Sequence, residues 1–403
     1  MWQKKGMLLT MKEKTRVEAV QAIMDGRLSV AQAAHVLNLS ERQVYRALAA
    51  AREQGLTGLV HGNRGRAPWN KGDEALWESV LRLVQKRYTD INDCHLQELL
   101  EREHSIHVHP EALRRRLRAA GLAPKRKRRA RKFRRRRERR PAAGMLLQVD
   151  ASRHDWLEGR GPHLTLVGAK DDATGEVWAR FGEAETCWAY LSLMRTIFLS
   201  AGVPLSLYSD RHTIFHSPRE PSVIEQLANH RPLTQFGRAM EELGVSIIKA
   251  YSPQAKGRIE RQWGVFQDRL VVELRLSGAS TLEEANRVLD AFLADYNRRF
   301  TVPPREQTAV WRKSPSVRQL DRILCLKEWR VVGRDHVVSF DGLALQLTSG
   351  RKYFSLARQR VEVLQLRDGS VEVHHERRML TRFTATAIAR LMRKGATAKK
   401  QVA

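Results

Sequence analysis

Three carboxylates in the middle of the sequence have the types and positions expected of a metal-dependent phosphoryl-transfer site. Asp150 follows the apolar run MLLQV, Asp210 follows LSLYS, and Glu260 lies in a helical pattern beyond VSII. If the strands before Asp150 and Asp210 are neighbours, the two aspartates lie side by side and the helix lays Glu260 across them. Such clustered carboxylates repel one another unless cations compensate. Oxygen ligands favour Mg²⁺ or Mn²⁺, and two ions about 3.5 to 4 Å apart would activate an attacking oxygen and stabilise a leaving one.

Other polar residues near these acids compete for a role. Asp155 is the alternative to Asp150, but Asp150 follows the apolar strand more directly. Two further acids are interpreted as turn formers and three other side chains as bystanders or core residues: Asp171, Asp172, His154, His212 and Trp263. Because the chain has 44 acidic residues, the spacing of three acids is weak evidence until the elements around them are considered.

The segment 145–300 alternates strand and helix patterns. MLLQVD, HLTLVGAKD and EVWARFGEA are apolar runs of strand length, and DDATG between the last two suits a tight turn. PLSLYSD and VSIIKAYS follow as further strands, separated by helical patterns. Three antiparallel strands followed by alternating helices and strands predict a mixed five-stranded α/β sheet with helices on both faces.

The N-terminal region is helical. Residues 12–52 contain three helical patterns, with small Ala33 and Ala34 before the last turn and Ser40 placed to cap the third helix. The polar leading edge of that helix favours a helix-turn-helix that enters a major groove, with a plain three-helix bundle as the alternative. A second helical unit ends in a pattern that begins at Pro110 and stops at Gly121, and it also predicts a helix-turn-helix.

The net charge of the 403-residue chain is +28, which indicates a polyanionic partner. Within residues 125–140, thirteen of sixteen positions are Lys or Arg, and such a run is expected to stay solvated until it meets phosphates. No stretch is long and apolar enough to span a bilayer, and residues 1–11 are too short for a signal-peptide core. We therefore expect a cytoplasmic protein at the bacterial nucleoid, with no membrane partner.

Beyond Pro303 and Pro304, alternating apolar and polar residues with Gly-containing turns predict a small β-barrel. The expected order along the chain is a helix-turn-helix domain at 1–61, a basic linker at 62–73, a second helix-turn-helix-like domain at 74–123, an Arg/Lys-rich linker at 124–144, the α/β core at 145–300, a connector at 301–325, the barrel at 326–376 and a basic tail at 377–403.

The DNA contacts are expected on the recognition helices, the basic linkers and the start of the helix that carries Glu260. The predicted contact residues are Ser40, Arg42, Gln43, Tyr45, Arg46, Arg64, Arg66, Arg114, Arg115, Arg118, Arg134, Arg135, Arg136, Lys256 and Arg258. For Lys256 and Arg258, the alternative is a solvated helix start.

The segments QVDASRHDWLEG, LYSDRHTIF and YSPQAKGRIERQWGVFQDRL together resemble the integrase-type catalytic core of DDE transposases, particularly the ISNCY-type insertion-sequence enzymes. The resemblance covers about 145–300 and extends to SVAQAAHVLNLSERQVYRAL and LVHGNRGRAP near the N-terminus. It implies a ribonuclease-H-like core in which Asp150, Asp210 and Glu260 hold the metal ions. It also implies an enzyme that cuts an element's terminal inverted repeats, joins the 3′-hydroxyls to target double-stranded DNA, and acts as at least a dimer in the synapse. The C-terminal β segment resembles the small barrel of Mu-like transposases.

One feature departs from the compact integrase pattern. The spacing between Asp210 and Glu260 is longer, and the extra residues fall in HTIFHSPREPSVIEQLANHRP (212–232), which is rich in turn formers. Two alternatives stay open: a sequence-specific DNA-binding regulator whose ribonuclease-H-like domain is inactive, and a hydrolytic nuclease that differs only in its nucleophile.

Overall fold

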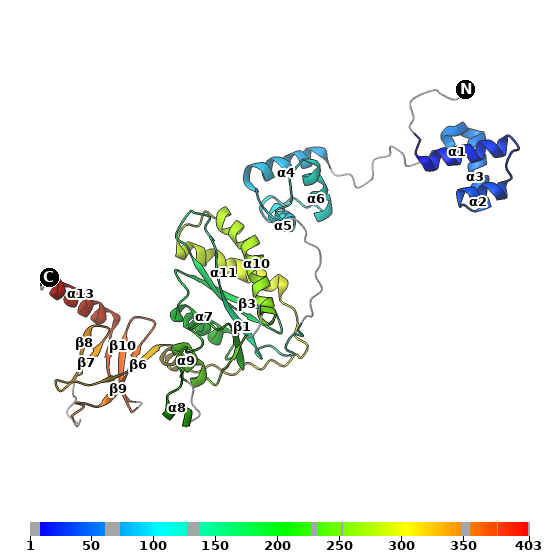
Figure 1. Ribbon diagram of the computed structural model, residues 1–403. Coiled ribbons are helices and arrows are strands. Elements are labelled where there is room, and N and C mark those ends of the chain that lie inside the picture. Colours follow the sequence, from blue (N-terminus) through cyan, green and yellow to red (C-terminus); the bar gives the residue numbers. More distant parts are fainter. Residues whose placement is uncertain are drawn as a thin grey trace. The chain divides into compact units, whose positions relative to one another are not determined.

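The computed structural model describes residues 9–60, 73–126, 137–227, 232–250, 253–347, 355–376 and 378–401 (Figure 1). The chain divides into two compact units, Met1–Arg87 and Tyr88–Ala403. Several predicted contact residues lie outside the description, at least in their side chains: Arg64, Arg66, Arg134, Arg135, Arg136 and Lys256. The finer domain boundaries remain predictions. No helix in the described parts is long and apolar enough to cross a membrane.

The first unit contains α1 (Met11–Met24), α2 (Val30–Leu37), α3 (Glu41–Gln54), the 3₁₀ helix η1 (Gly55–Leu59) and α4 (Glu74–Arg87). Ser40 caps α3, and Asn38 turns the chain between α2 and α3 with a φ of 51°. Ala33 and Val44 are fully buried, so the small side chain lets the second and third helices approach closely. The predicted helix-turn-helix is confirmed.

The second unit begins with α5 (Asp93–His104) and α6 (Pro110–Ala119). Pro110 begins α6 as predicted. Its fixed φ suits the first helical position, and the lack of an N–H costs nothing there because an N–H at that position has no acceptor within the helix. Gly121 follows the helix with a φ of +79°. The division of the chain leaves α4 in the first unit, so the two predicted helix-turn-helix domains do not coincide with the two units.

The α/β part of the second unit has five strands: β1 (Leu147–Arg153), β2 (Thr165–Asp171), β3 (Val177–Gly182), β4 (Ser206–Ser209) and β5 (Ser246–Lys249). Their order is β3-β2-β1-β4-β5. The first three strands pair antiparallel, whereas β1, β4 and β5 pair parallel. The predicted mixed five-stranded sheet is therefore confirmed.

Helices cover both faces of this sheet (Figure 1). The covering helices are α7 (Cys187–Ser200), α9 (Gln235–Glu242), α10 (Pro253–Leu276) and α11 (Leu282–Phe300). The short helix α8 (Val223–Leu227) is exposed at both of its ends. One buried cluster joins α7 and α9 to β1 and β4, and a second joins α10 and α11 to β2 and β3. The second cluster fixes the helix that carries Glu260 against the sheet.

The C-terminal part contains α12 (Val317–Ile323), β6 (Leu326–Val331), β7 (Val337–Phe340), β8 (Leu343–Gln346), β9 (Arg360–Gln365), β10 (Val371–His375), β11 (Arg378–Phe383) and α13 (Ala385–Gln401). Among the described residues, the strands form a four-stranded sheet, β11-β10-β9-β6, and a separate pair, β7-β8. The predicted closed barrel is not confirmed. The predicted basic tail has regular structure instead, because β11 completes the larger sheet and Ile388 of α13 is buried in its core.

Candidate active site and nucleic-acid-binding residues

Asp150 and Asp210 lie on neighbouring parallel strands of the sheet. Leu147 pairs with Leu207 and Gln148 with Tyr208, so the same offset places Asp150 level with Asp210. Asp210 directly follows β4, as predicted, whereas β1 continues past Asp150 to Arg153 because it still pairs with β2 there. Both aspartates are partly exposed. The carboxyl end of β4 therefore presents two carboxylates at one point of the sheet.

Trp263 holds Asp150 from the helix side. Its indole Nε1 donates a hydrogen bond to Asp150 Oδ2 at 3.0 Å, and its ring is buried in the core under α10. Gly168 pairs with Asp150 in the adjacent strand, and a Cβ there would lie 2.5 Å from the Trp263 ring. The absence of a side chain at Gly168 thus gives the indole room to reach the carboxylate. Sequence reasoning assigned Trp263 to the core alone and missed this bond.

Glu260 lies on the turn of α10 that passes β1. Next to it, the Ile259 backbone N–H donates to Gln148 Oε1 at 3.2 Å, and Trp263 contacts Asp150 one turn later. The Glu260 side chain itself is exposed. Within the described ranges, no three His, Cys, Asp or Glu side chains converge as a metal site. The structure therefore brings the two aspartates together and places Glu260 on the adjoining helix, without closing a three-carboxylate cluster.

Tyr190 of α7 is a buried side chain whose pKa is affected by the charges of both aspartates. Its side chain is fully buried, and its hydroxyl donates to Glu185 Oε1 at 3.0 Å. Burial raises the pKa of Tyr190, and the charges of Glu185, Asp150 and Asp210 raise it further. This phenol is consequently a neutral hydrogen-bond donor to Glu185. Its position in an apolar helix gave no sequence signal for this role.

A set of polar side chains surrounds Asp210. The His212 backbone N–H donates to Asp210 Oδ1 at 3.1 Å, so His212 shapes the turn after β4 rather than only flanking the acid. His216 Nε2 lies 3.3 Å from Ser209 Oγ. Burial lowers the pKa of His216, and the positive charge of Lys249 lowers it further, against an opposing effect of Asp210. Lys249, which sequence reasoning did not select, therefore places a cation next to this turn.

Asp171 and Asp172 have different roles, although both were predicted to form a turn. Asp171 does so, accepting hydrogen bonds from the backbone of Ala173 and Thr174. The Asp172 carboxylate is fully buried and forms an ion cluster with Arg137 and Arg258. We call these three residues the Asp172 cluster.

The Asp172 carboxylate also accepts hydrogen bonds from the side chain of Gln148 and the backbone N–H of Arg140. Burial by itself would raise the pKa of Asp172, but the hydrogen bonds from Arg137 and Arg140 and the charge of Arg258 hold it below its usual value. Because Gln148 also accepts from the backbone of Ile259, the cluster ties the start of α10 to β1 beside Asp150.

The Asp172 cluster changes the interpretation of two predicted DNA-binding elements. Arg258 donates to Asp172 Oδ1 at 2.6 Å and to the Arg137 carbonyl at 2.6 Å, so its guanidinium is engaged within the protein. The basic run 125–140 was expected to be solvated, but both of its described ends are anchored. Arg137 binds Asp172 at one end, and Lys125 Nζ lies 3.3 Å from Asp268 Oδ1 at the other. The expectation of a free segment is therefore wrong for those ends.

On the predicted recognition helix α3, the five selected residues fall into two groups. Ser40 and Gln43 form a capping box, in which each side chain accepts from the backbone N–H of the other. Arg42, Tyr45 and Arg46 are exposed. The capping pair therefore stabilises the start of α3, and the exposed side chains remain the candidates for base contacts.

On α6, one of the three selected arginines is clearly committed to the fold. Arg118 donates to Asp93 Oδ2 at 2.6 Å and to the Leu122 carbonyl at 2.8 Å. Arg114 is half-exposed and pairs with Glu111 within the helix at 2.8 Å. Arg115 is exposed. Arg115 therefore remains a candidate for a phosphate contact.

Comparisons with known proteins give the family. Residues 16–76 match the family model described as a winged helix-turn helix. The chain is 34% identical over 91% of its length, and 80% of the relative's, to the protein y4bF of Sinorhizobium fredii, whose name describes it as a transposase. It is 29% identical over 92% of its length, and 87% of the relative's, to the transposase for insertion sequence IS1202 of Streptococcus pneumoniae.

Solved structures similar to the chain include the catalytic core domain of BIV integrase, at 21% identity and a TM-score of 0.28 over 39% of this chain and 85% of that one. They also include a simian T-cell lymphotropic virus intasome, at 14% identity and a TM-score of 0.34 over 74% of this chain and 97% of that one. The conclusion rests on the relatives in sequence, which align over nine-tenths of the chain. The chain belongs to the family of insertion-sequence transposases.

Proposed function

We propose that this transposase binds the terminal inverted repeats of its insertion sequence and joins their 3′-hydroxyls to target DNA, with Asp150, Asp210 and Glu260 as the catalytic acids. The observation that carries the proposal is the level placement of Asp150 and Asp210 on adjacent parallel strands, beside the helix that bears Glu260. Neighbouring carboxylates repel one another, and a bound divalent cation would offset that repulsion.

The donor set fits Mg²⁺ or Mn²⁺, because all three side chains offer carboxylate oxygens. Two such ions, when bound, would activate the attacking oxygen and stabilise the leaving oxygen. The chain's own residues orient the acids: Trp263 fixes one oxygen of Asp150, and the His212 backbone fixes one oxygen of Asp210. The exposed Glu260 side chain would complete the ligand set from the start of α10.

The direct test incubates the full chain with labelled element ends and a target plasmid in Mg²⁺. The proposal predicts both nicked ends and covalently joined products, which depend on the divalent ion. Nicking without joining would indicate a hydrolytic nuclease, and binding without nicking would indicate a DNA-binding regulator. Chemical cross-linking of the complex formed on two ends should show at least two copies of the chain.

A prediction for α3 separates base reading from helix stability. Arg42→Ala should weaken binding to the element's ends by about 1 to 3 kcal/mol if Arg42 contacts bases, with little effect on random DNA. Ser40→Ala removes the capping box and should lower the free energy of unfolding of the first unit by about 1 kcal/mol. Fluorescence anisotropy on both DNAs and thermal unfolding give the two quantities. An equal loss on both DNAs for Arg42→Ala would show a phosphate contact instead.

A second prediction concerns Arg134, Arg135 and Arg136 of the basic run. Contiguous arginines allow phosphate contacts but little base reading, so they should supply affinity without sequence choice. Log affinity falls as log salt rises, and each phosphate contact makes that fall steeper. Replacing all three arginines with Gln should therefore make the slope shallower by up to about 0.9 per lost phosphate contact. Arg137 is left unchanged because it binds Asp172. A variant that keeps its salt slope but loses its preference for the element's ends would contradict this division of roles.

A further inference from the structure

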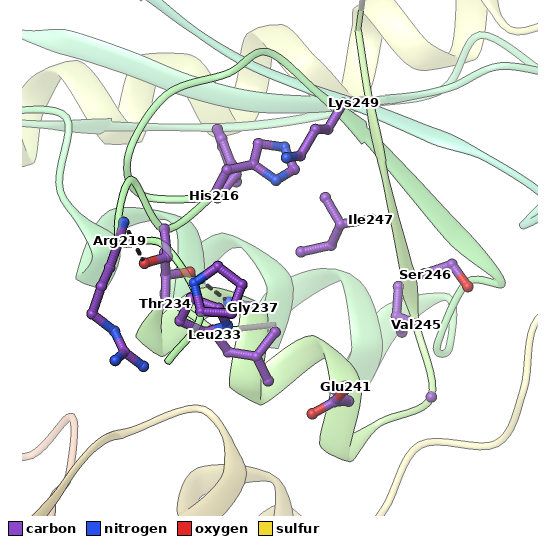
Figure 2. A pocket seen from close by; sticks show the side chains of 15 residues that line it. His216, Arg219, Leu233, Thr234, Gly237, Glu241, Val245, Ser246, Ile247 and Lys249 are labelled. Atoms are coloured by element: carbon purple, nitrogen blue, oxygen red, sulfur yellow. Dashed lines mark hydrogen bonds between the residues drawn. The ribbon is translucent and has the colours of Figure 1, made fainter. Parts of the chain in front are cut away.

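A pocket of about 710 Å³ lies at the edge of the five-stranded sheet, between β5, α9 and the first part of the 212–232 segment (Figure 2). β5 is the last strand in the sheet order, and Ser246, Ile247 and Lys249 of this strand line the pocket. The volume falls within the range of about 300 to 1,000 Å³ that is typical of small-molecule sites. The residues that lengthen the spacing between Asp210 and Glu260 thus help to build a pocket.

One wall of the pocket is basic and adjoins the candidate active site. Lys249 pairs in register with Ser209, the residue before Asp210. Figure 2 shows the His216 ring beside the Lys249 side chain, and Arg219 borders the same space. Among the lining residues, Glu241 is the carboxylate that opposes these cations. An anionic group in the pocket would therefore meet Lys249 within one residue of Asp210.

The pocket is also lined by apolar side chains. Leu233 lines the pocket and has 45% of its surface exposed, and Ile247 and Val245 of the β5 region border the same space. Pro221 and Pro232 flank them. These apolar side chains offer a surface that a nucleobase would cover. The pocket thus combines a cationic wall for a phosphate with an apolar wall for a base.

We propose that this pocket binds one unpaired nucleotide of the DNA strand that passes Asp210, with the phosphate at Lys249 and the base against Leu233 and Ile247. Arg219 binds the next phosphate along the strand. The proposal rests on the proposed function, because it needs DNA at Asp210. It assigns to residues 215–221, which follow β4, the role of holding a strand beside the site of cleavage.

The first measurement is the salt dependence of binding to a duplex that carries the element's end followed by a single-stranded flank. The full chain is used with Glu260→Gln, so that no turnover occurs. Lys249→Gln and Arg219→Gln are each added to this background. Each should make the negative slope of log affinity against log salt shallower by about 0.7, the value for one phosphate on a single strand. Arg287→Gln, at an exposed arginine of α11, is the matched control and should not change the slope.

The second measurement places 2-aminopurine at successive positions of the flank and records its fluorescence. The fluorescence of 2-aminopurine should increase at one flank position only, where the base unstacks from its neighbours and enters the pocket. Leu233→Glu should abolish that signal, whereas Leu199→Glu, at an α7 leucine that is 43% exposed, should preserve it. Far-ultraviolet circular dichroism checks that both variants fold.

Reduced salt slopes in Lys249→Gln and Arg219→Gln, together with loss of the fluorescent position in Leu233→Glu, would support the nucleotide pocket. Unchanged slopes in Lys249→Gln and Arg219→Gln would overturn it. Reduced slopes with no fluorescent position would also overturn it, and would leave a phosphate groove without a base site. Neither measurement needs cleavage of DNA, so these outcomes test the pocket alone. A failure of the proposed chemistry would appear instead as cleavage by the variants of Asp150, Asp210 or Glu260.

Discussion

Asp150→Asn, Asp210→Asn and Glu260→Gln should each abolish cleavage and joining while end binding stays near that of the parent chain. Each substitution keeps the size of the side chain and removes the negative charge that would bind a divalent ion. The loss should exceed the ~10- to 100-fold typical of removing an outer partner of a metal ligand. Gel assays of labelled ends in Mg²⁺ measure both steps, and anisotropy measures binding.

Asp155→Asn is the matched control for these variants. Asp155 lies five residues after Asp150, and its carboxylate accepts a hydrogen bond from the Gly159 backbone at 3.2 Å in a turn. Its loss should leave cleavage nearly unchanged. If Asp155→Asn were inactive and Asp150→Asn active, the assignment of the first acid would be wrong.

Asp172→Asn should lower the free energy of unfolding of the second unit by about 3 kcal/mol or more. The Asp172 carboxylate is fully buried, and Arg258, its partner, is only 16% exposed, so the substitution leaves a poorly solvated guanidinium without its counter-charge. Urea unfolding followed by tryptophan fluorescence measures the change. Asp295→Asn is the matched control, because Asp295 also pairs with two arginines but its side chain is 45% exposed on α11. This substitution should lower the free energy of unfolding by at most about 1 kcal/mol.

The effect of Asp172→Asn should also depend on pH. The folded-state pKa of Asp172 is lowered, so its contribution to stability is present above the unfolded-state pKa of about 3.9 and is lost as the pH falls through the folded-state value. The difference between parent and variant should therefore be complete at neutral pH and shrink in acid. A loss no larger than that of Asp295→Asn at pH 7 would contradict the structural role of the Asp172 cluster.

Local sequence patterns were sufficient for the elements that hold the candidate acids. The apolar run LSLYS forms β4, which ends directly before Asp210, because a short buried strand needs a continuous apolar segment. Ser40 and Pro110 marked helix starts, since their capping and φ preferences act within one turn. The alternation of strands and helices predicted a mixed sheet but left the adjacency of the strands before Asp150 and Asp210 as a condition. The structure meets that condition by pairing β1 with β4.

Contacts between distant segments could not be read from the same patterns. Asp172 sits in a DDATG turn that looks purely local, yet Arg137 and Arg258, its partners, come from opposite sides of it in the sequence. The bond from Trp263 to Asp150 depends on the missing side chain of Gly168 on a neighbouring strand. Barrel closure likewise depends on how strands pair, which alternation of apolar and polar residues does not specify.

The central claim is that these carboxylates bind a divalent ion during catalysis, and Asp210→Cys tests it most directly. A thiolate is a poor ligand for Mg²⁺ and a better one for the softer Mn²⁺. Cleavage of labelled element ends by this variant should therefore be absent in Mg²⁺ and partly restored in Mn²⁺, with a melting temperature close to that of the parent chain. Cleavage in Mg²⁺ at the parent's rate, or no cleavage in either ion by a variant that folds normally, would contradict the account.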